Sequence, residues 1–495
     1  MASRNELQII RAARAGHASA QLALGRRYLF GGSGLPRSPK TALYWLDRAA
    51  NQQQEDAWML IGRHVPFEVA REVMQPSSMS IWYERAYDAG MAEAGLVYAR
   101  LVLQQSASTP GARRKALAAL EAAAHAGITE AQWLLAQQCG NADASARIDN
   151  GVAVLWITRA AEGGLPAAQR ALAEHGWACA DRALFLRWAL PLARTISQGR
   201  EVSECSARQL APCDVVLLSR CGQALMQQPE AEVQAVEHFL ELAALARDRD
   251  AQYFLGLWYA KSDPDGVRLA ACKGLAHYKK AIRWLLLAAQ QSHPDAWFAL
   301  SRIYLKAECS QRNLVEARVH LRRAAEAGHA QAQAEFGTLL WRTRSDGPDQ
   351  DVEAAAWLQK AAKRGHAVAR DLLKKVAGPA MSGAWAIAAR HRVTRELLAV
   401  QPFLAARLEL AALFGLSRTE ALLLDISAAD RGHCLLIDVR AARPRSRRRL
   451  ILLDTAAQRQ ALEKIMRLFG NVDSGVAGPE GSYRQRLYRL NTLLA

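Results

Sequence analysis

Small and large apolar residues recur along the chain at helical spacing and predict pairs of α-helices. The first helix of a pair, helix A, has an alanine, a glycine five residues later and an aromatic residue or leucine three further on. The second, helix B, has an alanine, a tryptophan three residues later and an Ala-Ala pair that precedes a glycine. The helix A alanines recur every 37 residues, at Ala20, Ala57, Ala94, Ala131 and Ala168. This period predicts a repeat array in which each helix pair packs on its neighbours.

The residue types at these positions have a physical reason. Ala and Gly at a helix crossing let the two backbones approach closely, while Trp, Tyr or Leu fills the space between neighbouring pairs. The glycine after helix B adopts the left-handed conformation that ends a helix. We therefore expect the aromatic residues to form the core of the array rather than a cofactor or stacking site. Nine helix B elements are visible in the sequence.

The repeat register predicts four parts of the chain. Residues 1–194 and 236–378 contain the repeats, and residues 195–235 lose the register and include two prolines. This middle segment is predicted to be an insertion or a degenerate repeat pair. Beyond Gly378-Pro379 the period ends, and residues 380–495 are predicted to form a small α/β domain.

The hydrophobic pattern of that last part predicts both helices and strands. Helices are expected over 402–414 and 418–424, and strands over 434–440 and 450–454. A further helix is expected to begin after Thr455, a typical N-cap residue. Because the segment between the two strands reads AARPRSRRR, the sequence predicts a hairpin with a basic tip.

The distribution of charge also points to this hairpin as a candidate binding site. The chain has 64 Lys and Arg against 47 Asp and Glu, a net charge of +17, and residues 380–495 contribute +8 of it. Guanidinium groups pair bidentately with phosphate, so the loop arginines are candidates for contact with DNA or an acidic partner. The alternative is a solvated turn with surplus charge. The candidates are Arg440, Arg443, Arg445, Arg447, Arg448 and Arg449.

The repeat motif resembles a known family. The first copy reads AQLALGRRY, then GSG, then KTALYWLDRAA, and residues 12–378 are similar to the Sel1-like repeat, a relative of the tetratricopeptide repeat. The resemblance implies an all-α fold, an alpha-alpha superhelical solenoid of about nine repeats. It also implies a non-catalytic scaffold or adaptor that binds a protein partner through its helical surface. Exposed arginines near one Ala-Ala pair are the candidate binding residues: Arg318, Arg322 and Arg323.

Residues 402–470 also resemble, in part, the start of a tyrosine-recombinase (integrase) catalytic domain. The likeness rests on GLSRTEALLLDI followed by a hairpin with a basic tip. Ser417 stands where that family has an arginine, and no HxxR motif follows. One alternative is therefore a DNA strand-transfer enzyme or accessory factor in which Tyr483 or Tyr488 is the nucleophile. The other alternative is a purely protein-binding scaffold that contacts no nucleic acid.

Other features exclude further classes of function. No phosphate-binding loop, HExxH or GxSxG motif is present, so the sequence predicts no enzyme and no cofactor. The eight cysteines form no CxxC pair. The even spacing of Cys205, Cys213 and Cys221 lacks an accompanying ligand pair, so no metal site is expected. Free thiols and the absence of a secretory signal or a long apolar segment predict a cytoplasmic protein without membrane contact.

Overall fold

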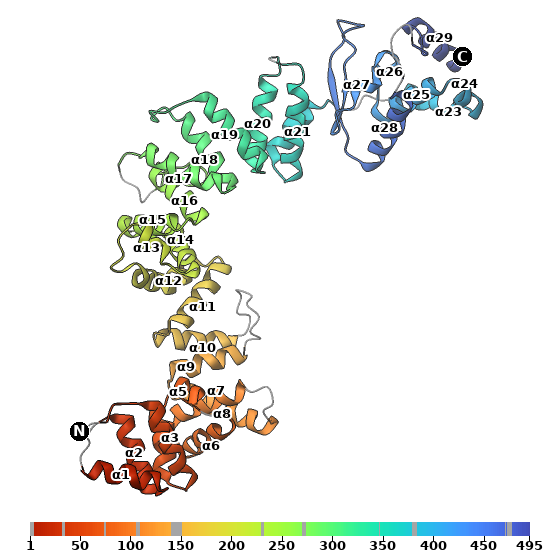
Figure 1. Cartoon of the computed structure of the whole chain (residues 1–495). Coiled ribbons are helices and arrows are strands. Elements are labelled where there is room, and N and C mark those ends of the chain that lie inside the picture. The colour runs from red at the N-terminus through yellow and green to blue at the C-terminus, as the bar shows by residue number, and fades with distance from the viewer. Residues whose placement is uncertain are drawn as a thin grey trace. The chain divides into compact units, whose positions relative to one another are not determined.

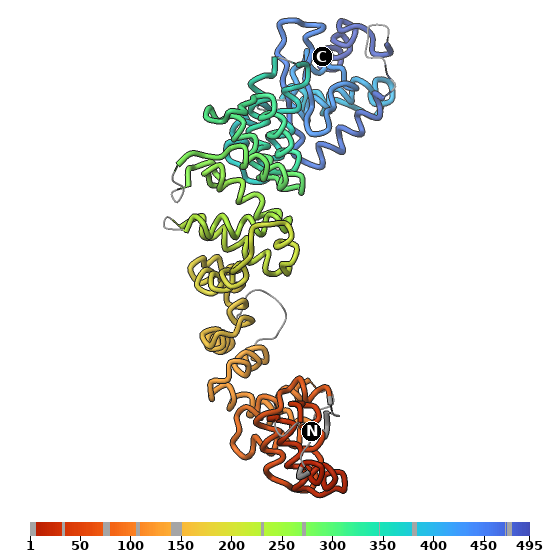
Figure 2. Tube along the Cα trace, turned by 60° about the vertical axis from the view of Figure 1, so that its left-hand side comes forward, coloured from red at the N-terminus to blue at the C-terminus, as the bar shows by residue number. Residues whose placement is uncertain are grey.

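The computed structural model describes residues 4–31, 35–73, 76–104, 109–139, 151–228, 232–269, 274–345, 347–378, 384–470, 472 and 478–495. The chain divides into two compact units. The first comprises Met1–Val202 and Gln209–Ala224, and the second comprises Ser203–Arg208 and Leu225–Ala495. Helices follow one another through both units (Figure 1), and Figure 2 shows the same succession as a Cα trace.

The helices up to the division between the units run in chain order. They are α1 (Arg4–Arg14), α2 (Ala18–Phe30), α3 (Pro39–Asn51), α4 (Glu55–His64), α5 (Phe67–Val73), α6 (Pro76–Asp88), α7 (Ala92–Leu103), α8 (Pro110–His125), α9 (Thr129–Cys139), α10 (Gly151–Glu162), α11 (Pro166–Ala178), α12 (Arg182–Ser197), α13 (Glu204–Arg208) and α14 (Pro212–Met226).

The remaining repeat helices are α15 (Val233–Leu245), α16 (Arg249–Ala260), α17 (Tyr278–Gln290), α18 (Pro294–Leu305), α19 (Leu314–Glu326), α20 (Ala330–Arg342), α21 (Gln350–Lys363) and α22 (Ala367–Val376). Among the described residues, helices A and B alternate as nine successive pairs, from α2 with α3 to α20 with α21, and α22 is a final helix A. The prediction of an all-α solenoid of about nine repeats is confirmed.

Glycine marks the point where helix A crosses helix B. A Cβ atom built on Gly256 would lie 2.6 Å from Cγ of Leu285, and one on Gly25 would lie 2.7 Å from Cγ of Leu46. Both distances are far below the roughly 3.5–4.0 Å of a normal carbon contact. The same approach recurs at Gly337. The predicted close crossing is therefore present in both units.

A glutamine completes the junction between successive repeats. In five repeats, the residue after the helix A alanine is a glutamine whose Nε2 donates to a carbonyl oxygen at the end of the preceding helix B, 3.0–3.1 Å away. Gln333, for example, donates to Ala325. The carbonyl oxygen of Ala325 also accepts the backbone N–H of Gly328 at 3.1 Å, so the glutamine adds a second hydrogen bond that ties each repeat to the next.

Helix B ends in a left-handed residue, as the sequence predicts. Gly365 follows α21 with φ of 88°, and its neighbour His366 donates its backbone N–H to the carbonyl oxygen of Ala361. Ser292 takes the equivalent place after α17 with φ of 63°. Serine has a steric penalty in this conformation that glycine does not. The turn is thus set by the repeat geometry and not by glycine alone.

The irregular segments keep the helical order. In the second repeat, the short helix α5 replaces the glycine loop. Within residues 195–235, α14 lies beside α11, because Arg170 pairs with Asp214 and Arg220 pairs with Glu174, each at 2.6 Å. Helix α14 thus takes the place of a helix A, which favours a degenerate repeat, and the short α13 precedes it. Part of the long loop 262–273 and the boundary residues 379–383 lie outside the described residues.

The described residues of the C-terminal part form seven helices around one hairpin. Strands β1 (Cys434–Ile437) and β2 (Arg449–Leu452) are antiparallel, with Cys434 opposite Leu452, so the predicted hairpin is present. The helices are α23 (Ala384–His391), α24 (Arg395–Val400), α25 (Pro402–Phe414), α26 (Arg418–Leu423), α27 (Ile426–Ala429), α28 (Ala456–Phe469) and α29 (Tyr483–Leu494).

The hairpin has two buried faces because side chains alternate along a strand. Leu435 and Ile437 pack into the core formed by α25 and α28. Cys434 and Leu436 pack instead against the last repeat, together with Leu358 of α21. The hairpin therefore covers the end of the repeat array and joins it to the C-terminal helices, and both belong to the second compact unit.

A buried ion pair holds the C-terminal helices together. Arg407 of α25 donates from Nε and Nη2 to the two carboxylate oxygens of Glu480, each at 2.6 Å. Its Nη1 donates to the carbonyl oxygens of Ala421 and Leu424 at the end of α26, at 2.8 and 2.9 Å. A buried charge is tolerated only when it is paired and hydrogen-bonded in this way. Because Glu480 closely precedes α29, the pair also fixes where that helix begins.

Replacing Gly256 by alanine tests the helix crossing. The added methyl group overlaps Leu285, so Gly256→Ala is expected to lower the free energy of unfolding by about 1–2 kcal/mol. The loss is expected although alanine favours helix by about 1 kcal/mol over glycine. Denaturant unfolding followed by circular dichroism measures the change. Gly378→Ala, where a Cβ meets open space, is the control. If the two variants were equally stable, a close approach of the two helices at Gly256 would be contradicted.

Candidate functional site

An open groove of about 990 Å³ crosses the last repeats. Helices α18 and α19, one face of α20 and the start of α22 form its walls. Six residues of α20 line it at spacings of three, one, three, one and three: Gln331, Ala334, Glu335, Thr338, Leu339 and Arg342. This spacing places them along one side of the helix. The opposite side of α20 carries the buried Ala332, Phe336 and Gly337, and a Cβ on Gly337 would meet α21, so the groove lies on the side turned away from the helix B of the same repeat.

Exposed apolar side chains line this groove where two helices begin. Asn313 caps α19 through hydrogen bonds from the N–H groups of Val315 and Glu316, and His366 caps α22 through one from Ala369. Each cap fixes its first turn and presents an apolar residue to solvent. Leu314, Val315 and Val368 are 60%, 71% and 61% exposed. Large apolar residues gathered on a surface indicate a binding site.

The charged residues of the groove leave it positive. Glu335 accepts a hydrogen bond from Arg302 at 2.6 Å and another from Gln331 at 3.1 Å, so its carboxylate is engaged. Arg318 and Arg342 also line the groove, and neither forms an ion pair with any residue that the structure describes. The positive charge of the groove that is not in an ion pair therefore comes from these two arginines.

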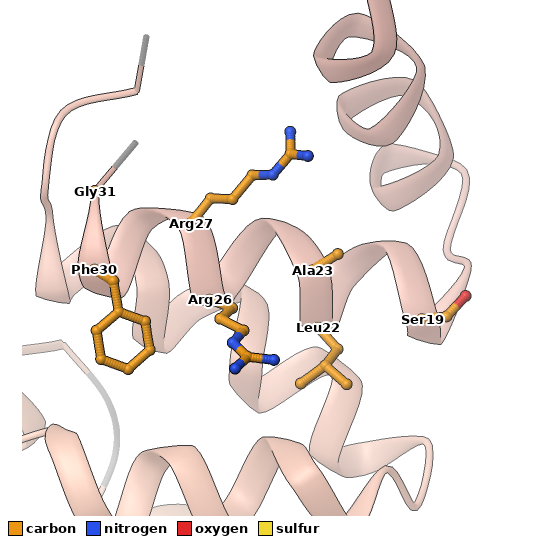
Figure 3. A pocket seen from close by; sticks show the side chains of 7 residues that line it. All are labelled: Ser19, Leu22, Ala23, Arg26, Arg27, Phe30 and Gly31. Atoms are coloured by element: carbon orange, nitrogen blue, oxygen red, sulfur yellow. The ribbon is translucent and has the colours of Figure 1, made fainter. Parts of the chain in front are cut away.

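A second groove, of about 460 Å³, lies on the first repeat and is lined by the same positions of the repeat. It is lined by Ser19, Leu22, Ala23, Arg26, Arg27 and Phe30 of α2 and by Gly31, which follows the helix (Figure 3). Counted from Ala20, the first six occupy the same places as the α20 residues counted from Ala332. Leu22, Arg26 and Phe30 project from one side of α2 in Figure 3. The open side of helix A, called here the A face, thus recurs in both units.

The three predicted protein-binding arginines have different environments. Arg318 lines the larger groove. Arg322 is exposed and pairs with Glu326 on its own helix at 2.9 Å. Arg323 lies over the ring of Trp297, 4.9 Å from the ring centre. The structure therefore places only Arg318 among the residues of the groove.

Three of the six loop arginines are held by acidic side chains. Arg440 binds both carboxylate oxygens of Asp438, and this hydrogen bonding lowers the pKa of Asp438 to about 2. Arg448 donates to Asp351 at 2.7 and 2.8 Å and to Asp349 at 3.1 Å, both near the start of α21. These contacts fasten the loop to itself and to the last repeat.

Arg449 is fastened to α26. It donates from Nε and Nη2 to the two carboxylate oxygens of Glu420, each at 2.9 Å. Burial raises the pKa of Glu420, but hydrogen bonds from Arg449 and from Ser417 outweigh it and leave the pKa below its usual value. The same carboxylate closes the capping box of α26 with Ser417. Arg449 therefore has a structural role in the hairpin.

The other three loop arginines are exposed. Arg443, Arg445 and Arg447 form no ion pair within the described part of the chain. Arg443 lies over the ring of Tyr483, 5.6 Å from the ring centre, which brings the loop next to the start of α29. Tyr483 is partly buried among leucines, whereas Tyr488 on the same helix is 74% exposed. The loop and α29 thus form one basic and aromatic surface.

Comparison with known proteins identifies the repeats. A family model of the Sel1 repeat matches residues 18–53, 129–165, 249–293, 294–329 and 344–366. The chain contains Sel1 repeats. The first four matches each span a helix A and the following helix B, and the fifth contains α21. The smaller groove lies on the first match, which contains α2. Helices α18 and α19 of the larger groove belong to the fourth match, whereas α20 and α22 lie outside the matched residues.

Two solved structures of Sel1-type repeats are similar to this chain. One is the crystal structure of c5321, a protective antigen of uropathogenic Escherichia coli with an SLR fold. It has 19% identity and a TM-score of 0.44, covering 100% of this chain and 98% of that one. The other, a Sel1 repeat protein from Oxalobacter formigenes, has 25% identity and a TM-score of 0.25, covering 75% and 90%. No curated protein sequence matches this chain.

The structure describes seven of the eight cysteines, and all seven are free thiols. Of the evenly spaced cysteines, Cys205 and Cys213 are exposed, whereas Cys221 is buried and its pKa is raised to about 12 by burial. Among the described residues, His, Cys, Asp and Glu do not gather in groups of three that could bind a metal ion. Across the same residues, none of the helices has the length and apolar character needed to cross a membrane.

Sequence reasoning missed most of the groove. Val315, Val368 and Arg342 were not among the candidates, although an apolar residue in the first turn after a helix cap can be recognised in the sequence. The partners of Arg448 were also missed, because Asp349 and Asp351 are 99 and 97 residues away in the chain. Glu420, the partner of Arg449, belongs to the motif SRTE, whose capping-box spacing is visible in the sequence.

His320 is expected to give the second unit a pH-dependent stability. His320 is buried and stacked on Trp297, with the ring centres 5.3 Å apart. Burial lowers the pKa of His320 and Arg323 adds to the effect, while Glu316 opposes it from 3.8 Å. Below its normal pKa of about 6.5, the histidine of the unfolded chain binds the proton more readily. The free energy of unfolding is therefore expected to fall as pH decreases through this range.

Denaturant unfolding between about pH 7.5 and 5.5 measures this dependence. His320→Gln removes the titrating group, so its stability is expected to decrease less with acidification than that of the wild type. The comparison uses the change with pH and not the stability at one pH, because the substitution also alters packing against Trp297. An unchanged pH dependence in the variant would show that His320 does not contribute.

Proposed function

We propose that this protein is a non-catalytic scaffold that binds a segment of a protein partner on the A face of its Sel1 repeats. The observation that supports it most is the groove on α18–α22, where Leu314, Val315 and Val368 are exposed together. Sel1 repeat proteins in general act as scaffolds for protein interactions. The free thiols of the described cysteines favour work in the reducing cytoplasm.

Covering the exposed apolar side chains of the groove contributes free energy to binding. Covering a fully exposed Val or Leu side chain contributes about 1.5–3 kcal/mol, so these three residues together contribute several kcal/mol toward the cost of association. The helix caps hold two of the three, Val315 and Val368, in place before binding, which reduces the entropy lost on association. A partner is thus expected to bind without rearrangement of α19 or α22.

Site-specific photo-crosslinking with the full chain tests this proposal. A photoreactive amino acid in place of Gln331, which is exposed in the groove, is expected to give adducts with a protein partner in cells that express the chain. The same amino acid in place of Arg322, exposed on α19 but outside the groove, is the control. Adducts of equal yield from both positions would contradict a site on the A face.

A second function is favoured by the surface at the hairpin loop, and we propose that it binds the phosphate backbone of DNA. The residues that support this are Arg443, Arg445 and Arg447, which are exposed and engaged in no ion pair among the described residues. Arg440, Arg448 and Arg449 hold the loop in place instead. The nearby Tyr483 supports Arg443 without closing it off from solvent.

Salt-dependent binding of a labelled DNA duplex tests this second function. Replacing Arg443, Arg445 and Arg447 by alanine is expected to weaken binding and to reduce the slope of log K against log salt concentration by about 0.9 for each phosphate that an arginine no longer neutralises. The control replaces Arg11, Arg113 and Arg114, exposed arginines of the first unit, and alters the net charge equally. A loss of affinity of the same size in both variants would mean that the binding reflects overall charge and not the loop.

A further inference from the structure

The groove on α18–α22 combines two kinds of surface that a single partner must match. Leu314, Val315 and Val368 offer an apolar wall, and Leu305 at the end of α18 extends it. Arg318 lies four residues after Leu314 on the same side of α19, and Arg342 lies at the end of the groove face of α20. The apolar wall is therefore accompanied by arginines from two different helices.

The balance of charge decides the chemistry of the partner. The one carboxylate of the groove, Glu335, is already bound to Arg302, while Arg318 and Arg342 have no acidic partner among the described residues. His366 uses Nδ1 to cap α22 and adds no negative charge. An arginine beside an apolar surface gains most from a carboxylate, which it can bind bidentately. A basic segment would instead place like charges together.

The length of the groove accommodates a helical segment. Neighbouring helices pack about 8–10 Å apart, so the distance from α18 across α20 to α22 is roughly 20 Å. A helix of about 13 residues has this length. Such a helix presents apolar residues on one side and acidic residues beside them, which is the common helix-in-groove mode of recognition.

We infer that the groove binds an acidic amphipathic helix of a partner protein, with its apolar side on Val315 and Val368 and its carboxylates on Arg318 and Arg342. This inference rests on the proposed scaffold function and adds the chemistry of the partner. Leu305 and Leu314 border the same apolar contact. The acidic residues provide the selectivity, because an apolar wall alone does not distinguish one amphipathic helix from another.

Three fluorescein-labelled peptides of about 16 residues serve as probes. They share one apolar face and carry glutamate, glutamine or lysine on the flanking positions. Fluorescence anisotropy with the full chain is expected to show that the glutamate peptide binds at least about tenfold more tightly than the lysine peptide. The glutamine peptide is expected between them. Equal binding of the three peptides, or preference for the glutamine or lysine peptide, would overturn the inference.

Variants of the groove locate the binding. Val315→Asp is expected to weaken binding of the glutamate peptide about tenfold, whereas Val400→Asp, at an exposed valine of α24, leaves it unchanged. The double variant Arg318→Glu and Arg342→Glu is expected to reverse the preference toward the lysine peptide. The charge-matched double variant Arg322→Glu and Arg323→Glu lies outside the groove and is expected to retain the wild-type preference. Circular dichroism confirms that each variant is folded.

The outcomes separate this inference from the scaffold function. If the peptides show no charge preference but Gln331 still gives protein adducts, the groove binds a partner of other chemistry and only this inference fails. If the adducts are absent as well, the scaffold function fails with it. A glutamate preference that survives the Arg318 and Arg342 substitutions places the binding elsewhere on this basic chain and also overturns the inference.

Discussion

The close approach of helix A to helix B at glycine is the constraint on which the repeats depend. At Gly256 the partner Leu285 occupies the space of a side chain, so one side of helix A is fully used for packing within the repeat. The opposite side is left open in both grooves, at Ser19 to Phe30 and at Gln331 to Arg342. The residues that specify the fold and those available for binding thus occupy opposite sides of one helix. Binding residues can vary without cost to the crossing.

An array of identical pairs leaves an apolar end that must be covered. Here the hairpin covers it, with Cys434, Leu436 and Leu450 on the last repeat and Leu435 and Ile437 on the C-terminal helices. Arg448 strengthens the same junction by binding Asp349 and Asp351 at the start of α21. Two negative charges at a helix N-terminus are favourable because of the helix dipole. The guanidinium group of Arg448 donates directional hydrogen bonds to both carboxylates. The basic hairpin therefore has a structural role in addition to any binding.

The fold could be predicted from the sequence because its signals are local. The 37-residue register, the crossing glycines and the cap at Thr455 each involve residues close together in the chain. The candidate site was predicted less well, because binding depends on which charges remain unpaired after folding. Arg448 and Arg449 looked equivalent to Arg445 in the sequence, yet acidic side chains from α21 and α26 engage the first two. Likewise, helical periodicity cannot show that the next repeat leaves Arg318 in a groove and Arg322 outside it.

The positive charge of the chain indicates where a partner binds only after the arginines that are paired with acidic side chains are set aside. Arg100 with Glu130 and Arg302 with Glu335 bridge successive helices A, so many charges of the repeats serve to connect neighbours. Arginines without such a partner among the described residues include Arg318 and Arg342 in the groove and Arg443, Arg445 and Arg447 in the loop. The groove adds apolar walls, whereas the loop adds the aromatic ring of Tyr483 beneath Arg443. Since an apolar wall favours a folded peptide and an exposed basic loop favours a phosphate backbone, we propose different partners for the two surfaces.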